Sequence, residues 1–154
     1  MSNAPRSVIV AAALCTAQAL GAAADRAAAF AGGFRPGAYR IDAHYGMPHL
    51  EQNLRHARTT ERRCLHGVGD LATVFPVLRD TSMQGCALER AERIDAGTLH
   101  YTLVCRSSQA PTGSAVVHAE PGRIHGVLHV KGGAKNMTYS QRVEAARHGD
   151  CTSG

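Results

Sequence analysis

The sequence predicts a mainly β domain, an antiparallel meander of roughly six to eight strands that is curved into a half-barrel or small barrel and carries one short helix. Three observations support this class. Apolar and polar residues alternate over several short runs, glycine-containing turns separate neighbouring runs, and one face alone is consistently apolar. A two-layer β-sandwich is the alternative arrangement.

The first predicted strand covers residues 37–45, where Tyr39, Ile41 and Ala43 share one face. Residues 47–60 follow it and are mostly polar, without an alternating pattern. We interpret this second stretch as a polar connection that is partly helical.

A short helix is predicted next. Asp70 is a residue type that caps helices, and Leu71, Val74 and Phe75 behind it form an apolar stripe. Pro76 is expected to end this helix, because proline cannot donate the backbone hydrogen bond that would continue it.

A β-hairpin is predicted over residues 86–105, because two strand-like runs flank a turn in which Gly97 can adopt a left-handed conformation. If Ile94 pairs with Gly97, Cys86 falls directly opposite Cys105. Directly opposed residues have β-carbons close enough for a disulfide. The hairpin therefore predicts a Cys86 to Cys105 bond.

A second turn is predicted at Pro121-Gly122. It sets Val117 opposite Gly126 on the apolar face. Apolar residues occupy odd-numbered positions before the turn and even-numbered positions after it. This register requires that change if both sets are to lie on one face. After a glycine-rich turn, a last strand follows with one face made by Met137, Tyr139, Gln141 and Val143.

The apolar face of these strands is expected to be concave. Its lining residues would be Leu99, Tyr101, Leu103, Val117, Leu128 and Tyr139. Such a face forms the protein core more often than a cavity, but a cavity of several hundred cubic ångströms there would accept a small apolar ligand.

Residues 1–24 are predicted to be a signal peptide that is removed on export. Arg6 provides the positive start, residues 8–24 are largely apolar and rich in alanine, and residues 22–24 offer a small-x-small cleavage site. A retained membrane anchor is the alternative, but the stretch is at the short end of the roughly 20 residues that cross a bilayer. Residues 25–154 are then expected to be a single disulfide-stapled β domain that is periplasmic or secreted.

Removal of the signal peptide takes away Cys15 and leaves four cysteines in an oxidising compartment. Since the hairpin pairs two of them, the remaining disulfide joins Cys64 to Cys151. A zinc site of four thiolates is the alternative, but the chain has no short Cys-x-x-Cys pair.

Histidine is unusually frequent, with nine residues. They are His44, His49, His56, His66, His100, His118, His125, His129 and His148. The Pro121-Gly122 turn sets His118 opposite His125, and a loop that pairs Cys105 with Gly113 would place His100 beside His118. Three imidazoles would then form a row on the face away from the core.

This row predicts a transition-metal site for copper or zinc, because imidazole nitrogen is a common ligand of both ions. His118 and His125 are the expected pair, with His100 as the third ligand and His129 as its substitute. A solvated polar face without a metal is the alternative interpretation.

The net charge of +5 does not indicate a nucleic-acid partner, because the arginines are spread along the chain. Aromatic residues make up 5% of the chain and tryptophan is absent, so platforms for base stacking are lacking. No serine lies in a Gly-x-Ser-x-Gly elbow, and Gly132-Gly133 lacks the lysine of a phosphate loop.

We therefore expect a non-enzymatic exported module that binds a small apolar ligand or another protein of the cell envelope. The alternative is a periplasmic protein that binds a transition metal through surface histidines.

Several short motifs occur together along residues 36–151. They are Pro36-Gly37-Ala38-Tyr39, Cys64-Leu65, Cys86, Val104-Cys105, the glycines Gly113 and Gly126, Met137-Thr138-Tyr139 and Gly149-Asp150-Cys151. In this set the chain resembles the domain-of-unknown-function family numbered 3617, over nearly the whole mature sequence. The resemblance implies a small exported bacterial protein, and the family has no established activity, substrate or catalytic residues.

Overall fold

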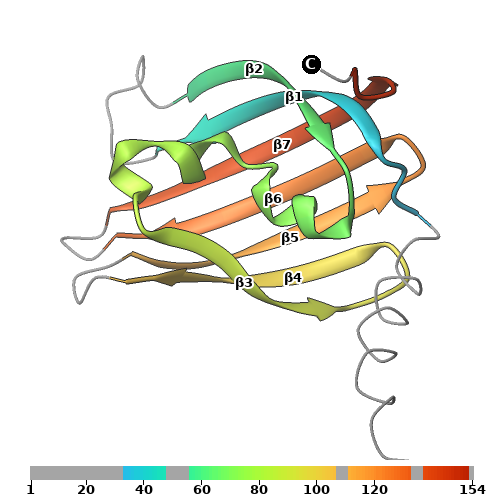
Figure 1. The fold of residues 1–154 in the computed structure, drawn as a ribbon. Helices are drawn as coiled ribbons and strands as arrows, with labels where there is room; N and C mark the ends of the chain where they lie inside the picture. The colour runs from blue at the N-terminus through green and yellow to red at the C-terminus, as the bar shows by residue number, and fades with distance from the viewer. Residues whose placement is uncertain (1–32, 48–55, 107–110, 133–136, 153–154) are drawn as a thin grey trace, which may run out of the picture.

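A single open antiparallel sheet dominates the computed structural model, which describes residues 33–47, 56–106, 111–132 and 137–152 (Figure 1). Its seven strands follow the order β2-β1-β7-β6-β5-β4-β3. They are β1 (Gly37–Gly46), β2 (His56–Leu65), β3 (Cys86–Arg93), β4 (Thr98–Cys105), β5 (Thr112–Glu120), β6 (Arg123–Lys131) and β7 (Thr138–Gly149). The predicted mainly β class is confirmed.

The sheet is not closed into a barrel. Closure would require its two edge strands, β2 and β3, to pair with each other. Both edges carry many charged side chains, which disfavour pairing between edges. In the part of the chain that the structure describes, the strands form one sheet and not the two layers of a sandwich.

The order of the strands places β2 and β3 at opposite edges although they follow each other in the sequence. The segment that joins them, residues 66–85, must therefore cross the sheet. This segment, called the connector below, contains the 3-10 helices η1 (Val68–Thr73), η2 (Pro76–Arg79) and η3 (Thr81–Met83). In Figure 1 the connector lies in front of the sheet and covers its inner face.

The core lies between the inner face of the sheet and the connector. From the connector, Leu71, Phe75 and Met83 are buried. Of the residues predicted to line a concave apolar face, Leu99, Tyr101, Leu103, Val117 and Leu128 are buried and Tyr139 is partly buried. These six side chains pack in one cluster with the apolar side chains of the connector.

Gly126 makes room for the connector at the centre of the inner face. A β-carbon added at Gly126 would lie 2.8 Å from Cζ of Phe75 and 2.8 Å from Cγ2 of Val143. Both neighbours are fully buried, so neither can move aside easily. The aromatic ring of Phe75 thus packs directly on the backbone of β6.

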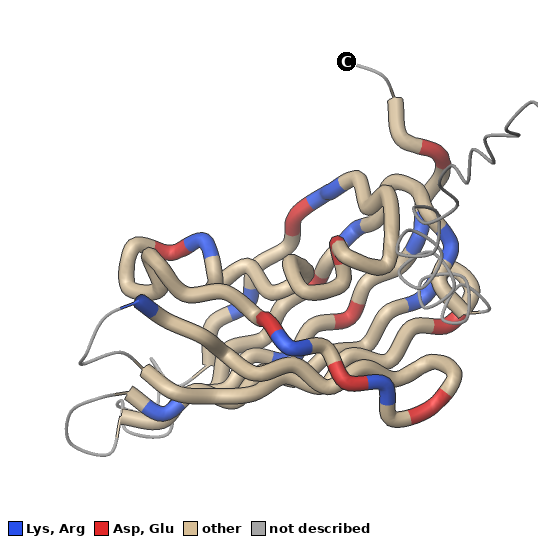
Figure 2. Tube along the Cα trace, turned by 60° about the horizontal axis from the view of Figure 1, so that its bottom comes forward, with Lys and Arg blue, Asp and Glu red and all other residues tan. Residues whose placement is uncertain are grey.

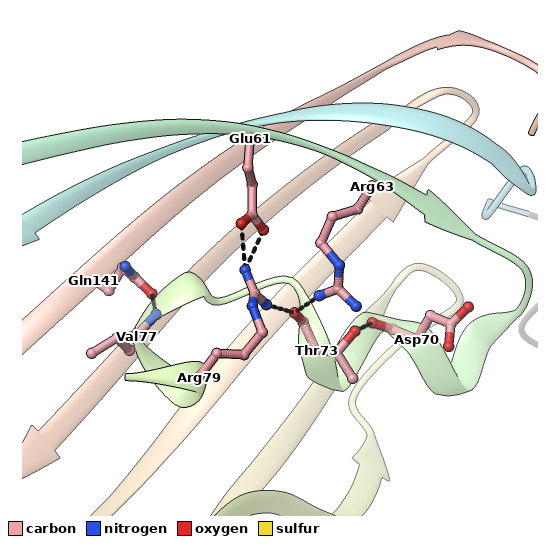
Figure 3. A network of polar contacts seen from close by, with 7 residues as sticks. All are labelled: Glu61, Arg63, Asp70, Thr73, Val77, Arg79 and Gln141. Atoms are coloured by element: carbon pink, nitrogen blue, oxygen red, sulfur yellow. Dashed lines mark hydrogen bonds and ion pairs between the residues drawn. The ribbon is translucent and has the colours of Figure 1, made fainter. Parts of the chain in front are cut away.

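A polar clamp, made of Glu61, Arg63, Thr73 and Arg79, fastens the connector to β2 (Figure 3). The guanidinium of Arg79 lies 2.5 Å from the Glu61 carboxylate and donates to the Thr73 carbonyl at 3.2 Å. Arg63 donates to the same carbonyl at 2.5 Å. Two arginines thus share one carbonyl oxygen, which satisfies a backbone acceptor at the end of η1.

A buried amide fastens the connector to the middle of the sheet. Gln141 on β7 is completely buried, and its Oε1 accepts a hydrogen bond of 3.3 Å from the backbone N–H of Val77 (Figure 3). The side chain supplies an acceptor to a backbone donor that has no strand partner, so it sets the height of η2 above the sheet.

The predicted polar connection over residues 47–60 is wrong in its second half, because β2 begins at His56. Residues 48–55 lie outside the described part. β2 is an edge strand in which six of the ten residues are exposed, three are half-buried and only Leu65 is buried. Its backbone pairing with β1 holds it extended, so no alternation of apolar residues marks it in the sequence.

The predicted short helix is a series of 3-10 turns. The N-cap of η1 is Gly67, and Asp70 lies inside the first turn. The Asp70 carboxylate accepts the backbone N–H of His66 at 2.6 Å and that of Gly67 at 3.4 Å, so it still caps the helix start. Pro76 opens η2, because its fixed φ suits a first helical position.

Both predicted disulfides are confirmed, with Cα–Cα separations of 5.6 Å for Cys64–Cys151 and 4.0 Å for Cys86–Cys105. At the tip of the hairpin the register differs by one residue from the prediction. Gly97 is the predicted partner of Ile94, but the Ile94 N–H donates to the carbonyl of Thr98. A bulge at Arg90, whose φ is +52°, absorbs this offset of one residue. The cysteines are therefore opposite each other as predicted.

The substitution Gly126→Ala is expected to lower the free energy of unfolding by about 1–3 kcal/mol, because the new methyl group overpacks Phe75. Urea denaturation measures the loss. Gly69→Ala is the control, since a β-carbon there meets nothing within 4 Å. Equal stability of the Gly126→Ala and Gly69→Ala variants would contradict this packing.

Alkaline pH is expected to destabilise the fold through its buried tyrosines. Burial raises the pKa of Tyr101 from 10.0 to about 12. The folded chain therefore holds a phenol proton that the unfolded chain loses above about pH 10, and stability declines as the pH rises from about 10 to about 12. Denaturant midpoints measured across this range should fall less steeply for Tyr101→Phe than for the wild type. Parallel curves for the two proteins would contradict the assignment.

Candidate functional site

The outer face of the sheet, opposite the connector, holds most of the polar side chains that the sequence analysis selected. Alternation places the even-numbered residues of β5 and the odd-numbered residues of β6 on this face. A hollow of about 420 Å³ lies over β5, β6 and β7, and we call it the outer groove. It is lined by Val116, His118, His125, Gly126, Val127, Arg142, Val143 and Glu144.

His118 and His125 face each other across β5 and β6, as the Pro121-Gly122 turn predicts. The Nδ1 atom of His118 lies 2.8 Å from the Thr98 hydroxyl oxygen, and its Nε2 atom lies 3.4 Å from the Glu120 carboxylate. The side chain of His118 is 44% exposed. Both of its ring nitrogens therefore have protein partners at the surface.

His100 does not lie beside His118, so the predicted row of three imidazoles is wrong. Thr98 is opposite His118 instead, and His100 is opposite Val116. Gly113 pairs with Leu103, two residues from the predicted partner. A shift of two residues keeps every side chain on its face, so the apolar alternation cannot detect it. The N–H of Ala119 donates to the carbonyl of Gly97 at 2.8 Å, which agrees with the pairing of Thr98 with His118.

The observed registers create a continuous polar row across six strands of the outer face. In order from β4 to β2 its members are Thr98, His118, His125, Glu144, Asp42 and Thr60. Two imidazoles are thus followed by two carboxylates. The Thr60 hydroxyl donates to Asp42 at 2.5 Å and is the main reason that the pKa of Asp42 lies below its usual value.

A second row runs parallel to the first, two residues along each strand. Its members are His100, Val116, Val127, Arg142, His44 and Arg58. The valines are central, and Val116 is 44% exposed. Arg142 on β7 and His44 on β1 lie two residues along their strands from Glu144 and Asp42, the carboxylates of the polar row. The outer groove therefore combines an apolar centre with both signs of charge.

The remaining predicted ligand, His129, lies four residues from His125 on the same face. It pairs with Ser114 on β5 and with Ser140 on β7, so its neighbours in the sheet are hydroxyl groups. It does not join His118 and His125. Of the other histidines, His49 lies outside the described residues.

The contact sequence Thr98, His118, Glu120 resembles the order of groups in a hydrolase triad, but its setting does not favour catalysis. The backbone N–H groups of Gly97 and Thr98 are occupied by the Asp95 carboxylate, which accepts the Gly97 N–H at 2.8 Å. An oxyanion needs free donors aimed at one point. The arrangement is explained as a surface hydrogen-bond chain.

A second hollow, of about 520 Å³, lies at the edge of the sheet around the Cys64–Cys151 disulfide, and we call it the edge pocket. It is lined by Ala38, Arg62, Arg63, Cys64, His148, Gly149, Asp150, Cys151 and Thr152. Its disulfide is predicted by the sequence, but the pocket is not. The only signal was the density of arginines before Cys64, which does not show what the C-terminal residues contact.

Figure 2 shows acidic and basic residues interspersed over the molecule. They alternate along β3, where the sequence reads Glu89, Arg90, Glu92 and Arg93. This alternation protects the edge against pairing with another strand and leaves no broad basic stripe there.

No family model, curated protein or solved structure matches this chain. Within the described part of the chain, none of the helices has the length and apolar character needed to cross a bilayer.

Proposed function

We propose that this protein is an exported, non-enzymatic module of the bacterial cell envelope that binds another protein through the outer face of its sheet. One observation carries the proposal. The inner face is covered by the chain's own connector, whereas the described residues leave the outer face uncovered, with a groove that has an exposed apolar centre.

The composition of the outer groove favours a protein over a small apolar ligand. Small apolar ligands bind in enclosed, mainly hydrophobic cavities. Here two valines are surrounded by imidazoles, Arg142 and Glu144. An apolar centre with a polar, charged rim is typical of protein interfaces, where the rim supplies orientation and the centre supplies affinity.

Membership of the family numbered 3617 and location in the periplasm, or secretion, are part of this proposal. The four cysteines that contribute to the resemblance are paired as two disulfides, and disulfides persist in oxidising compartments. Residues 1–24, the predicted signal peptide, lie outside the described part.

Substitution at the centre of the outer groove should separate partner binding from folding. We expect Val116→Glu to reduce cross-linked capture of a periplasmic partner by the exported protein at least tenfold, because it places a charge in the apolar centre. Ile94→Glu is the matched control, since Ile94 is 64% exposed at the hairpin tip, outside the groove. Quantitative mass spectrometry of the captured material measures the ratio. Equal capture by both variants, or capture of no specific protein, would refute the proposed interface.

A second candidate function is transition-metal binding on the same face. The observation that favours it is the adjacency of His118, His125 and Glu144 in register on three neighbouring strands. Two imidazoles and a carboxylate are a donor set that suits zinc or copper. Binding would require His118 to release Thr98 or Glu120.

For this candidate, calorimetric titration of the oxidised protein with copper or zinc is the test. His118→Ala and Glu144→Gln should each lower the affinity at least tenfold, because each removes one ligand. His100→Ala should leave the affinity unchanged, because its register partner is Val116. A loss with His100→Ala, or no binding by the wild type, would count against this site.

A further inference from the structure

We propose that Cys64, Cys151 and His66 form a redox-gated metal site, which binds zinc when the disulfide is reduced and is blocked when the disulfide is formed. The site is separate from the outer face and does not depend on the function proposed above. It lies at the edge pocket, where the end of β2 meets the C-terminal residues.

The ligand atoms are already grouped. The two sulfur atoms are joined in the disulfide, and a ring nitrogen of His66 lies within 4.8 Å of both. Once the disulfide is broken, the sulfurs must separate to about 3.8 Å to bind one tetrahedral zinc. Among the described residues, the His118, His125 and Glu144 side chains make no such group. Nδ1 of His66 is 3.8 Å from Sγ of Cys64. Tetrahedral zinc, with bonds of about 2.3 Å to sulfur and about 2.0 Å to nitrogen, requires a sulfur to nitrogen separation of about 3.5 Å.

The backbone holds these ligands independently of the disulfide bond. Cys64 pairs with Ala38 on β1, and Ala38 pairs with Gly149 on β7, two residues before Cys151. The backbone of His66 is fixed by Asp70, whose carboxylate accepts the His66 N–H at 2.6 Å. Breaking the bond between the sulfurs therefore leaves both chain segments attached to the same three strands.

The surface accessibility of the site suits both exchange and binding. Cys64 and Cys151 are partly exposed, and His66 is exposed. Arg62, Arg63 and His148 line the same pocket.

The chemistry balances with a dithiol as the reductant. The dithiol gives two electrons and two protons to the disulfide, which becomes two thiols, and the dithiol becomes a disulfide. Zinc then binds both sulfurs and the imidazole, and two protons are released to solvent. Three protein ligands leave the fourth position for water or an added ligand. A disulfide oxidant reverses the step: it takes two electrons from the zinc-bound thiolates and two protons from solvent and becomes a dithiol, while the Cys64–Cys151 disulfide re-forms and the zinc is released.

The test uses the whole mature protein, reduced under anaerobic conditions, and titrated with zinc against a chromophoric chelator. Cobalt replaces zinc in a parallel titration, since a tetrahedral thiolate site gives intense visible bands and charge-transfer absorption. We expect one zinc per reduced chain and none at this site in the oxidised chain. His66→Ala should lower zinc affinity at least tenfold, whereas His148→Ala, which changes a pocket residue outside the ligand group, should not.

The second disulfide supplies the matched control for thiols. Cys86→Ala/Cys105→Ala should keep the cobalt spectrum, and Cys64→Ala/Cys151→Ala should lose it. Circular dichroism of the zinc-loaded, reduced protein should show the sheet. Binding that is insensitive to His66→Ala, a spectrum that depends on Cys86 and Cys105, or a zinc-loaded chain without its sheet would each overturn the proposal.

Discussion

The passage of the connector across the sheet is the constraint on which the rest of this structure depends. Because β2 and β3 are consecutive in the chain but lie at opposite edges, residues 66–85 must span the inner face. Their apolar side chains complete the core that the strands alone would expose. The polar clamp and the bond from Val77 to Gln141 hold this segment at the two points where it passes β2 and β7.

Covering one face decides where function can lie. An exposed inner face would have been a concave apolar surface of the kind that holds lipids or other apolar ligands. With the connector in place, the surfaces that the described strands leave uncovered are the outer face and the sheet edges. On the outer face, the strand registers align a polar row and, two residues along each strand, a row that mixes apolar and basic side chains. Polar and apolar side chains are therefore direct neighbours on this face.

The edge pocket links stability to chemistry. The Cys64–Cys151 bond closes a loop with a sequence separation of 87, for which the loss of unfolded-state entropy corresponds to about 4.5 kcal/mol. The same bond lies next to the His66 imidazole and the clamped end of β2. The same disulfide therefore stabilises the fold and contains the two sulfur atoms of the proposed zinc site. Its reduction would lower the stability of the fold and make both thiols available as ligands.

Local sequence determined the elements that depend on nearest neighbours. Alternation and the Pro121-Gly122 turn set the register of β5 and β6, and with it the pairing of His118 and His125, because a tight turn permits few alignments. The hairpin predicted the bond between Cys86 and Cys105, with the bulge at Arg90 compensating its tip.

Only the tertiary structure decided the rest. β2 is extended because its backbone pairs with β1, and its polar sequence has no apolar alternation that would predict this pairing. The position of His100 depends on the register between β4 and β5, which differs by two residues from the predicted one. A shift of two residues leaves every side chain on the same face, so the alternation of apolar residues cannot reveal it. The pairing of the remaining cysteines predicted that Cys64 meets Cys151, but only the structure shows the His66 ring turned toward them, with Nδ1 3.8 Å from Sγ of Cys64.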